Sequence, residues 1–242
     1  MYQFDWSILL GESGRLLLRG AEVTIELAAL ALVLALILGF LFGVLRWSAI
    51  GLLKPICWLY VEFLRNTPPL VQILFWYFSA TVILPNSVIL TLRDYGFQFI
   101  AATFALGLYH SGFIAEIVRG GLNAIPRGQY EAAQAIGFSF PQTIRYILLP
   151  QLLRITAPTL TNEAVSLVKN TSLALAIGVT EITYQARYID YTSFRGVEAL
   201  LAVTAFYLIL CLAIAAYRCD GYRERAFHPH PSDNPRMNRD SS

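Results

Sequence analysis

The stretch from Leu27 to Leu45 contains no Asp, Glu, Lys or Arg, and Glu26 and Arg46 bound it. A helix that crosses a hydrocarbon core of about 30 Å needs about 20 apolar residues, because each adds about 1.5 Å. This stretch therefore predicts a transmembrane helix. Composition agrees, since 56% of the 242 residues are hydrophobic and 14% are charged, whereas about a quarter are charged in an average soluble domain. The net charge of +2 gives no indication of nucleic-acid binding.

Four further segments are apolar enough and long enough to cross a bilayer. They are Pro55 to Leu84, Tyr95 to Ala115, Leu152 to Val179, and Ala199 to Tyr217. The sequence thus predicts an all-α polytopic membrane protein with about five transmembrane helices. Its expected organisation is an external N-terminal segment over 1–19, a membrane domain over 20–218 and a flexible tail over 219–242. The tail is polar and contains prolines, so we expect it to be largely disordered.

The lysines and arginines predict the orientation in the membrane. If the chain has five spans, eleven of its 18 lysines and arginines lie on one side of the membrane and five on the other. The remaining two, Arg65 and Lys169, lie within spans. Cytoplasmic loops hold the excess of positive charge. We therefore expect the N-terminus outside, the C-terminus in the cytoplasm, and the polar stretch from Arg119 to Tyr146 in the cytoplasm.

That polar stretch predicts a hairpin of two short helices, over about 120–150. Pro126 suits the first turn of a helix, and Gly137 can end that helix in a left-handed cap. Ser139 and Gln142 have the spacing of a capping box that begins a second helix, which we expect to stop at Pro150. On these grounds alone the hairpin has two interpretations. It is either a docking knob for another protein or a structural connection between spans.

The hairpin also carries a motif. It resembles, without a gap, the EAA…G…I-LP motif of the permease subunits of bacterial binding-protein-dependent ABC importers. The matching residues are Glu131, Ala132, Ala133, Gly137, Ile147, Leu149 and Pro150. The resemblance extends over nearly the whole chain, and YVEFLRNTPPLVQILFWYF and VKNTSLALAIGVTEITYQAR are similar to the polar amino-acid branch. The opening MYQFDW is most similar to its glutamate/aspartate permeases. The adjacent Pro68 and Pro69 depart from the single proline usual in that branch.

This resemblance implies a set of partners and a location. In that family the EAA loop forms coupling helices that dock on a separate ATPase, so those seven residues are the expected ATPase-coupling site. The expected partners are ABC ATPase subunits, a second permease (a copy of this chain or a sister chain), and a periplasmic or extracellular substrate-binding protein. The expected location is a bacterial cytoplasmic (inner) membrane. The expected function is ATP-driven import of polar amino acids, most similar to glutamate/aspartate import.

The fourth span predicts a polar stripe at membrane depth. At about 100° per residue, its polar residues fall within an arc of about 140°. They are Thr156, Thr159, Asn162, Glu163, Ser166, Lys169 and Asn170. Charged groups inside a bilayer tend to face a protein interior or a water-filled cavity. The stripe therefore either lines a substrate path or is buried in the protein, where an internal Glu163–Lys169 pair would hold helices together. A separation of six residues is unfavourable for direct contact between these two within one helix. His110 is expected to be a hydrogen-bonded interior histidine.

The second span supplies another candidate site. From Pro55 to Leu84 a continuous helix would measure about 45 Å, and the two prolines must interrupt it. Broken helices at depth recur at transporter binding sites. Arg65, Asn66 and Thr67 precede the break, where they could meet a substrate carboxylate. The alternative is that Arg65 extends to the lipid headgroups.

No signature of catalysis is present in the sequence. It has no G-x-x-x-x-G-K-[ST] phosphate loop, no nucleophile elbow and no zinc-protease signature. We therefore expect no enzyme activity, no metal site and no cofactor in this chain, with ATP and Mg²⁺ bound by the partner ATPase. The alternative function is a secondary transporter or channel driven by an ion gradient, which fits the polar stripe but not the hairpin.

Overall fold

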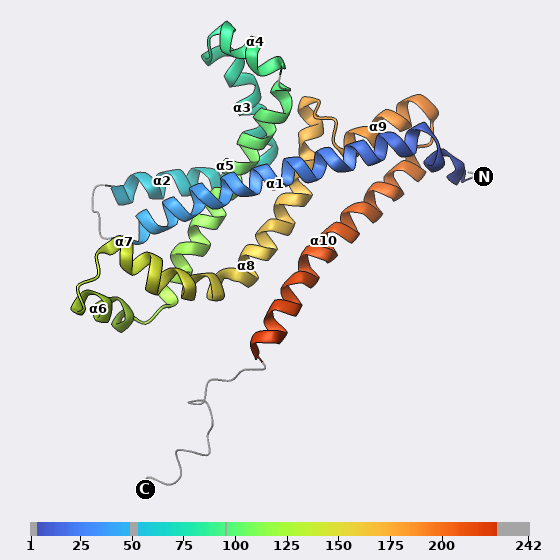
Figure 1. The fold of residues 1–242 in the computed structure, drawn as a ribbon. Helices are drawn as coiled ribbons and strands as arrows, with labels where there is room; N and C mark the ends of the chain where they lie inside the picture. The colour runs from blue at the N-terminus through green and yellow to red at the C-terminus, as the bar shows by residue number, and fades with distance from the viewer. Residues whose placement is uncertain (1–3, 49–52, 95, 227–242) are drawn as a thin grey trace.

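The computed structural model describes residues 4–48, 53–94 and 96–226 (Figure 1). All regular elements in these ranges are helical. They are the 3₁₀ turn Trp6–Leu10, α1 (Glu12–Trp47), α2 (Leu53–Asn66), α3 (Pro69–Ile83), α4 (Asn86–Asp94), α5 (Phe97–Ala124), α6 (Arg127–Ala135), α7 (Phe140–Gln142), the π-helical turn Thr143–Leu148, α8 (Leu149–Asn170), the 3₁₀ turn Thr171–Ile177, α9 (Ile182–Ser193) and α10 (Gly196–Ala226).

Three of these helices are long and apolar enough to cross a membrane unaided. They are α1, α5 and the part of α10 up to Ala216. A fourth span results if the continuous helical stretch Phe140–Ile177 and α9, which meet at an angle of 47°, are taken together. The first, third and fifth predicted spans thus correspond to α1, α5 and α10. The predicted all-α membrane architecture is confirmed.

The predicted break in the second span is also confirmed. Helix α2 ends at Asn66 and α3 begins at Pro69, with Pro68 in an extended conformation between them. The two helices have 14 and 15 residues, so each is shorter than the about 20 residues needed to cross the core. Gln72 connects them, because its Nε2 donates to the Leu64 carbonyl at 2.9 Å and to Thr67 Oγ1 at 3.0 Å.

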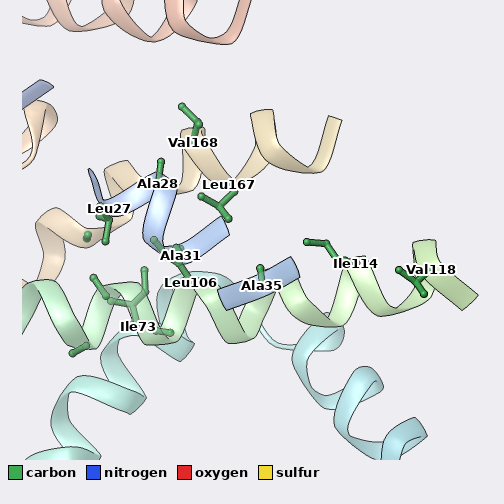
Figure 2. Packing of buried hydrophobic residues seen from close by; sticks show 14 of the residues in the cluster. Leu27, Ala28, Ala31, Ala35, Ile73, Leu106, Ile114, Val118, Leu167 and Val168 are labelled. Atoms are coloured by element: carbon green, nitrogen blue, oxygen red, sulfur yellow. The ribbon is translucent and has the colours of Figure 1, made fainter. Parts of the chain in front are cut away.

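Helices α1 and α5 form the centre of the protein. Small buried residues, among them Ala31, Ala35 and Gly39, repeat along one face of α1. Small residues let the backbones of membrane helices approach closely, and Figure 2 shows Ala31 and Ala35 of α1 beside Leu106 and Ile114 of α5. A Cβ placed on Gly39 would lie 2.5 Å from Cγ2 of Ile114. Glycine is therefore required here by the close approach of α5.

The second hairpin helix does not stop at Pro150, contrary to the prediction from sequence. Helical structure continues from Phe140 to Ile177, with Pro150 near the start of α8. The π-helical turn provides the reason. Leu149 donates its N–H to the Ile144 carbonyl, five residues back, and this wider turn makes room for a proline ring that a regular α-turn would force against a carbonyl.

Helix α9 was not predicted as a separate element. It packs with the start of α1 and the start of α10 around Leu17, Ile189 and Val203. Helix α10 continues to Ala226, so it includes the first residues of the predicted tail. The rest of that tail, 227–242, lies outside the described residues.

Candidate functional site

The hairpin has the local structure that its sequence predicts. Helix α6 ends at Ala135, and Gly137 adopts φ +87°, where L residues are disfavoured. The Phe138 N–H donates to the Ala133 carbonyl at 3.0 Å and closes the cap. Ser139 donates its N–H to Gln142 Oε1 at 2.8 Å, as a capping box requires. Two local motifs thus hold the turn between α6 and α7.

The motif residues of the hairpin divide into exposed and packed ones. Glu131, Ala132, Gly137 and Pro150 are exposed. Ala133 is 2% exposed and is the one buried residue of α6. Ile147 and Leu149 pack against the main core. A partner that docks on the hairpin would therefore meet one part of the motif, while the other part anchors the hairpin to the membrane helices.

Three exposed apolar side chains on the hairpin were not singled out from the sequence. Ile136 is 70% exposed, Phe140 40% and Tyr146 59%. Large exposed apolar side chains are typical of a surface that contacts another protein. A signal was available, because Ile136 directly precedes the glycine cap, where the chain leaves α6.

At membrane depth, a buried hydrogen-bonded group joins α5 and α8. His110, which is fully buried, has its Nδ1 2.5 Å from Glu163 Oε1 and its Nε2 3.2 Å from Asn170 Nδ2. His110 is thus hydrogen-bonded in the interior, as expected. Its partners, however, come from the polar stripe of α8, and residues 53 and 60 positions apart give no local pattern that would predict them.

The other residues of the polar stripe on α8 differ in their exposure. Thr156 is buried, and its methyl would lie 2.4 Å from a Cβ on Gly121 of α5. Asn162 and Thr159 are exposed, and Ser166 is half-buried. Lys169 is exposed and forms no ion pair within the described ranges. The carboxylate of Glu163 is bonded to His110 instead, so the structure does not form the internal Glu163–Lys169 pair considered from the sequence.

The second group of candidate residues lies at the α2–α3 break. Asn66 donates to the backbone carbonyl of Glu62 at 2.8 Å and to its carboxylate at 3.0 Å, and Thr67 bonds the Phe63 carbonyl. Arg65 lies 3.9 Å from Glu62 Oε1 and over the Phe113 ring at 5.5 Å. Arg65 thus contacts α5 at Phe113, whereas Glu163 and Asn170 of α8 contact α5 at His110.

A mutation can measure the bond between His110 and Glu163. We expect His110→Gln and Glu163→Gln each to lower the free energy of unfolding, and their double-mutant cycle to show a coupling of about 1–2 kcal/mol. The reason is that either change leaves a partner with a weaker bond in a buried position. Unfolding of the detergent-purified protein measures it. Thr159→Val, on the same helix at an exposed position, is the control and is expected to have little effect. Additive single mutants would show that the contact contributes nothing.

Comparison with known proteins shows the family. Residues 35–218 match the family described as binding-protein-dependent transport system inner membrane component. The glutamate/aspartate import permease protein GltJ of Escherichia coli K12 is 35% identical over 196 residues, which is 79% of each chain. The glutamine transport system permease protein GlnP of the same strain is 36% identical over 88% of this chain and 94% of GlnP.

A solved structure agrees in fold. The crystal structure of an amino acid ABC transporter with histidines superposes with a TM-score of 0.77 and 26% sequence identity, covering 92% of this chain and all of that one. The resemblance inferred from the hairpin motif is therefore confirmed over most of the chain. The protein belongs to the family of binding-protein-dependent transport system inner membrane components, the permeases of ABC importers.

Proposed function

We propose that this chain is the permease of an ATP-driven importer for acidic amino acids, glutamate and aspartate. Its relatives are permeases of amino-acid ABC importers, so ATP hydrolysis belongs to a separate ATPase and the ion-gradient mechanism is not favoured. The similarity of GltJ supports the acidic substrate, while GlnP, which is 36% identical and covers more of this chain, makes glutamine the second candidate.

The unpaired Lys169 is the observation that carries the acidic substrate. It is exposed on the polar face of α8, at membrane depth, and has no ion pair within the described part of the chain. A charged group in such a position needs a partner or water. The nearby carboxylate that would repel an anionic substrate, Glu163, is bonded to His110. Lys169 is thus a cation of this face that no carboxylate of the described residues pairs with, as binding of a substrate carboxylate requires.

Arg65 gives weaker support for an anionic substrate. Its Nε is buried without a hydrogen-bond partner, and its carboxylate partner is a distant 3.9 Å away. A carboxylate is the group that satisfies a guanidinium best, through paired hydrogen bonds. Asn66 and Thr67 use their side chains on the last carbonyls of α2. Their role in the proposal is therefore to hold the helix end in place.

The hairpin is the proposed connection to the ATPase. In this scheme it projects into the cytoplasm, with the N-terminus outside, and a second permease and an external binding protein complete the importer. The capped turn at Gly137 and the anchoring of Ile147 and Leu149 in the core make the hairpin stiff. A stiff hairpin transmits a movement of the ATPase subunits to α8, because helical structure is continuous from Phe140 to Ile177.

Competition for uptake tests the substrate. Uptake of radiolabelled glutamate is measured in cells that contain this permease with its cognate ATPase and binding protein. Unlabelled aspartate, glutamine, histidine or arginine is added in excess as a competitor. We expect aspartate alone to compete and an ATPase-dead variant to abolish uptake. Competition by glutamine would favour the second candidate, and competition by all would indicate a broad polar amino-acid importer. Uptake without a working ATPase would contradict the importer assignment itself.

A variant tests the role of Lys169. We expect Lys169→Gln to raise the KM for glutamate about tenfold, since one charge-assisted hydrogen bond contributes about 1.5–3 kcal/mol, and Lys169→Arg to keep most of the affinity. Arg154→Gln removes the same charge from an exposed position near the other end of α8 and serves as the control. An unchanged KM in Lys169→Gln would exclude Lys169 from the substrate path.

A further inference from the structure

We propose that the ends of α1, α2 and α5 form a binding site for the headgroup of an anionic phospholipid. A cavity of about 520 Å³ lies between these helix ends. Its lining includes Arg46, Lys54 and Arg119 together with Trp47 and Trp58. The expected ligand is a lipid phosphate with a net negative charge, such as that of phosphatidylglycerol.

The position of the cavity along the helices places it at the headgroup level. The charge-free stretch of α1 ends at Arg46, and that of α5 ends before Glu116 and Arg119. Helix α2 has its only lysine, Lys54, in its first turn. The hydrocarbon boundary is where charged residues and tryptophans gather in membrane helices. Three helices thus bring cations to the same boundary, whichever side of the membrane it faces.

The charges around the cavity favour an anion. Arg46 lies 2.6 Å from Glu116, which Arg119 also binds. Glu62 is shared between Arg46, at 3.8 Å, and Arg65. The cavity lining itself has three cationic residues, Arg46, Lys54 and Arg119, and no acidic one. Lys54 forms no ion pair among the described residues. Basic pockets between membrane helices at this level bind anionic lipid headgroups.

The surface beside the cavity suits the acyl chains of the same molecule. Along α2, Ile56, Leu59 and Phe63 are exposed by 64%, 64% and 53% and recur at helical spacing. Trp58, at the cavity, is 51% exposed. If the phosphate of a lipid occupies the cavity, its acyl chains can pack along this apolar face of α2. A soluble anion such as free phosphate would contact only the cationic side chains and not this apolar face of α2.

Native mass spectrometry of the intact importer, permease with its ATPase, tests this site. The complex in a neutral detergent is titrated with phosphatidylglycerol, with phosphatidylcholine and with inorganic phosphate. We expect phosphatidylglycerol to remain bound, and Lys54→Gln to weaken it about fivefold, the contribution of one lysine near a lipid phosphate. Lys54→Arg is expected to retain binding. Arg154→Gln, an exposed arginine at the start of α8, is expected to change nothing.

Several results would overturn the proposal. Equal retention of phosphatidylcholine would show that charge is not recognised, and displacement of the lipid by inorganic phosphate would assign the cavity to a soluble anion. An unchanged affinity in Lys54→Gln, or an equal loss in Arg154→Gln, would place the lipid elsewhere. Binding by the isolated permease that disappears in the complex would mean that the ATPase covers the cavity. None of these readouts depends on which amino acid is transported.

Discussion

Replacing Gly137 with Asp is expected to reduce uptake more than tenfold while the protein remains folded in the membrane. The proposed docking of the hairpin on the ATPase is the reason. A Cβ on Gly137 meets nothing within 4 Å, so the new side chain has open space around it, next in the chain to the exposed Ile136. A carboxylate at an apolar contact costs about 2 kcal/mol or more when it finds no partner. Uptake, the amount of protein in the membrane and ATPase activity are measured together.

The matched control is Gly137→Ala. It bears the same unfavourable left-handed backbone, φ +87°, at a cost of about 1–2 kcal/mol, but adds neither charge nor much volume. We expect it to keep most of the uptake. Normal uptake by the Asp variant would exclude the turn from the docking surface. Equal loss in both variants would assign the effect to backbone strain.

Replacing Gly39 with Leu is expected to prevent the protein from folding stably. A Cβ alone would lie 2.5 Å and 2.6 Å from two side-chain carbons of Ile114, and Ile114 is itself buried, at 1% exposed. Overpacking a close-packed interior costs about 1–3 kcal/mol and occasionally more, and four carbons at the α1–α5 contact place this change at the upper end. Size-exclusion chromatography of detergent extracts and the Tm measure the loss.

Two further variants make this second prediction specific. Gly120→Leu changes the same residue type on α5, where a Cβ meets nothing within 4 Å, and is expected to leave the Tm unchanged or slightly higher, because leucine favours a helix over glycine. Ile114→Ala combined with Gly39→Leu is expected to recover part of the lost stability. A Gly39→Leu protein with the normal Tm would show that the helices separate easily at this point.

Local features of the sequence predicted much of the fold. The charge-free stretches predicted α1, α5 and α10, the adjacent prolines predicted the break between α2 and α3, and the pattern around Gly137 and Ser139 predicted the hairpin. Each of these depends on residues a few positions apart, and on the requirement that backbone groups in a bilayer be hydrogen-bonded within the helix. The stop at Pro150 was wrong, because a change in helix type accommodated the ring.

The partners of the polar side chains were decided by the tertiary structure. The sequence identified Glu163 and Asn170 as members of a polar stripe, but only the packing of α8 on α5 brings both to His110. In the same way, Arg46 meets Glu116 across 70 residues. A residue's own helix fixes its face, whereas its partner depends on the rotation and separation of two helices. The rotation and separation depend on small residues such as Gly39 and Gly121, which allow a close contact only where a second helix packs against them.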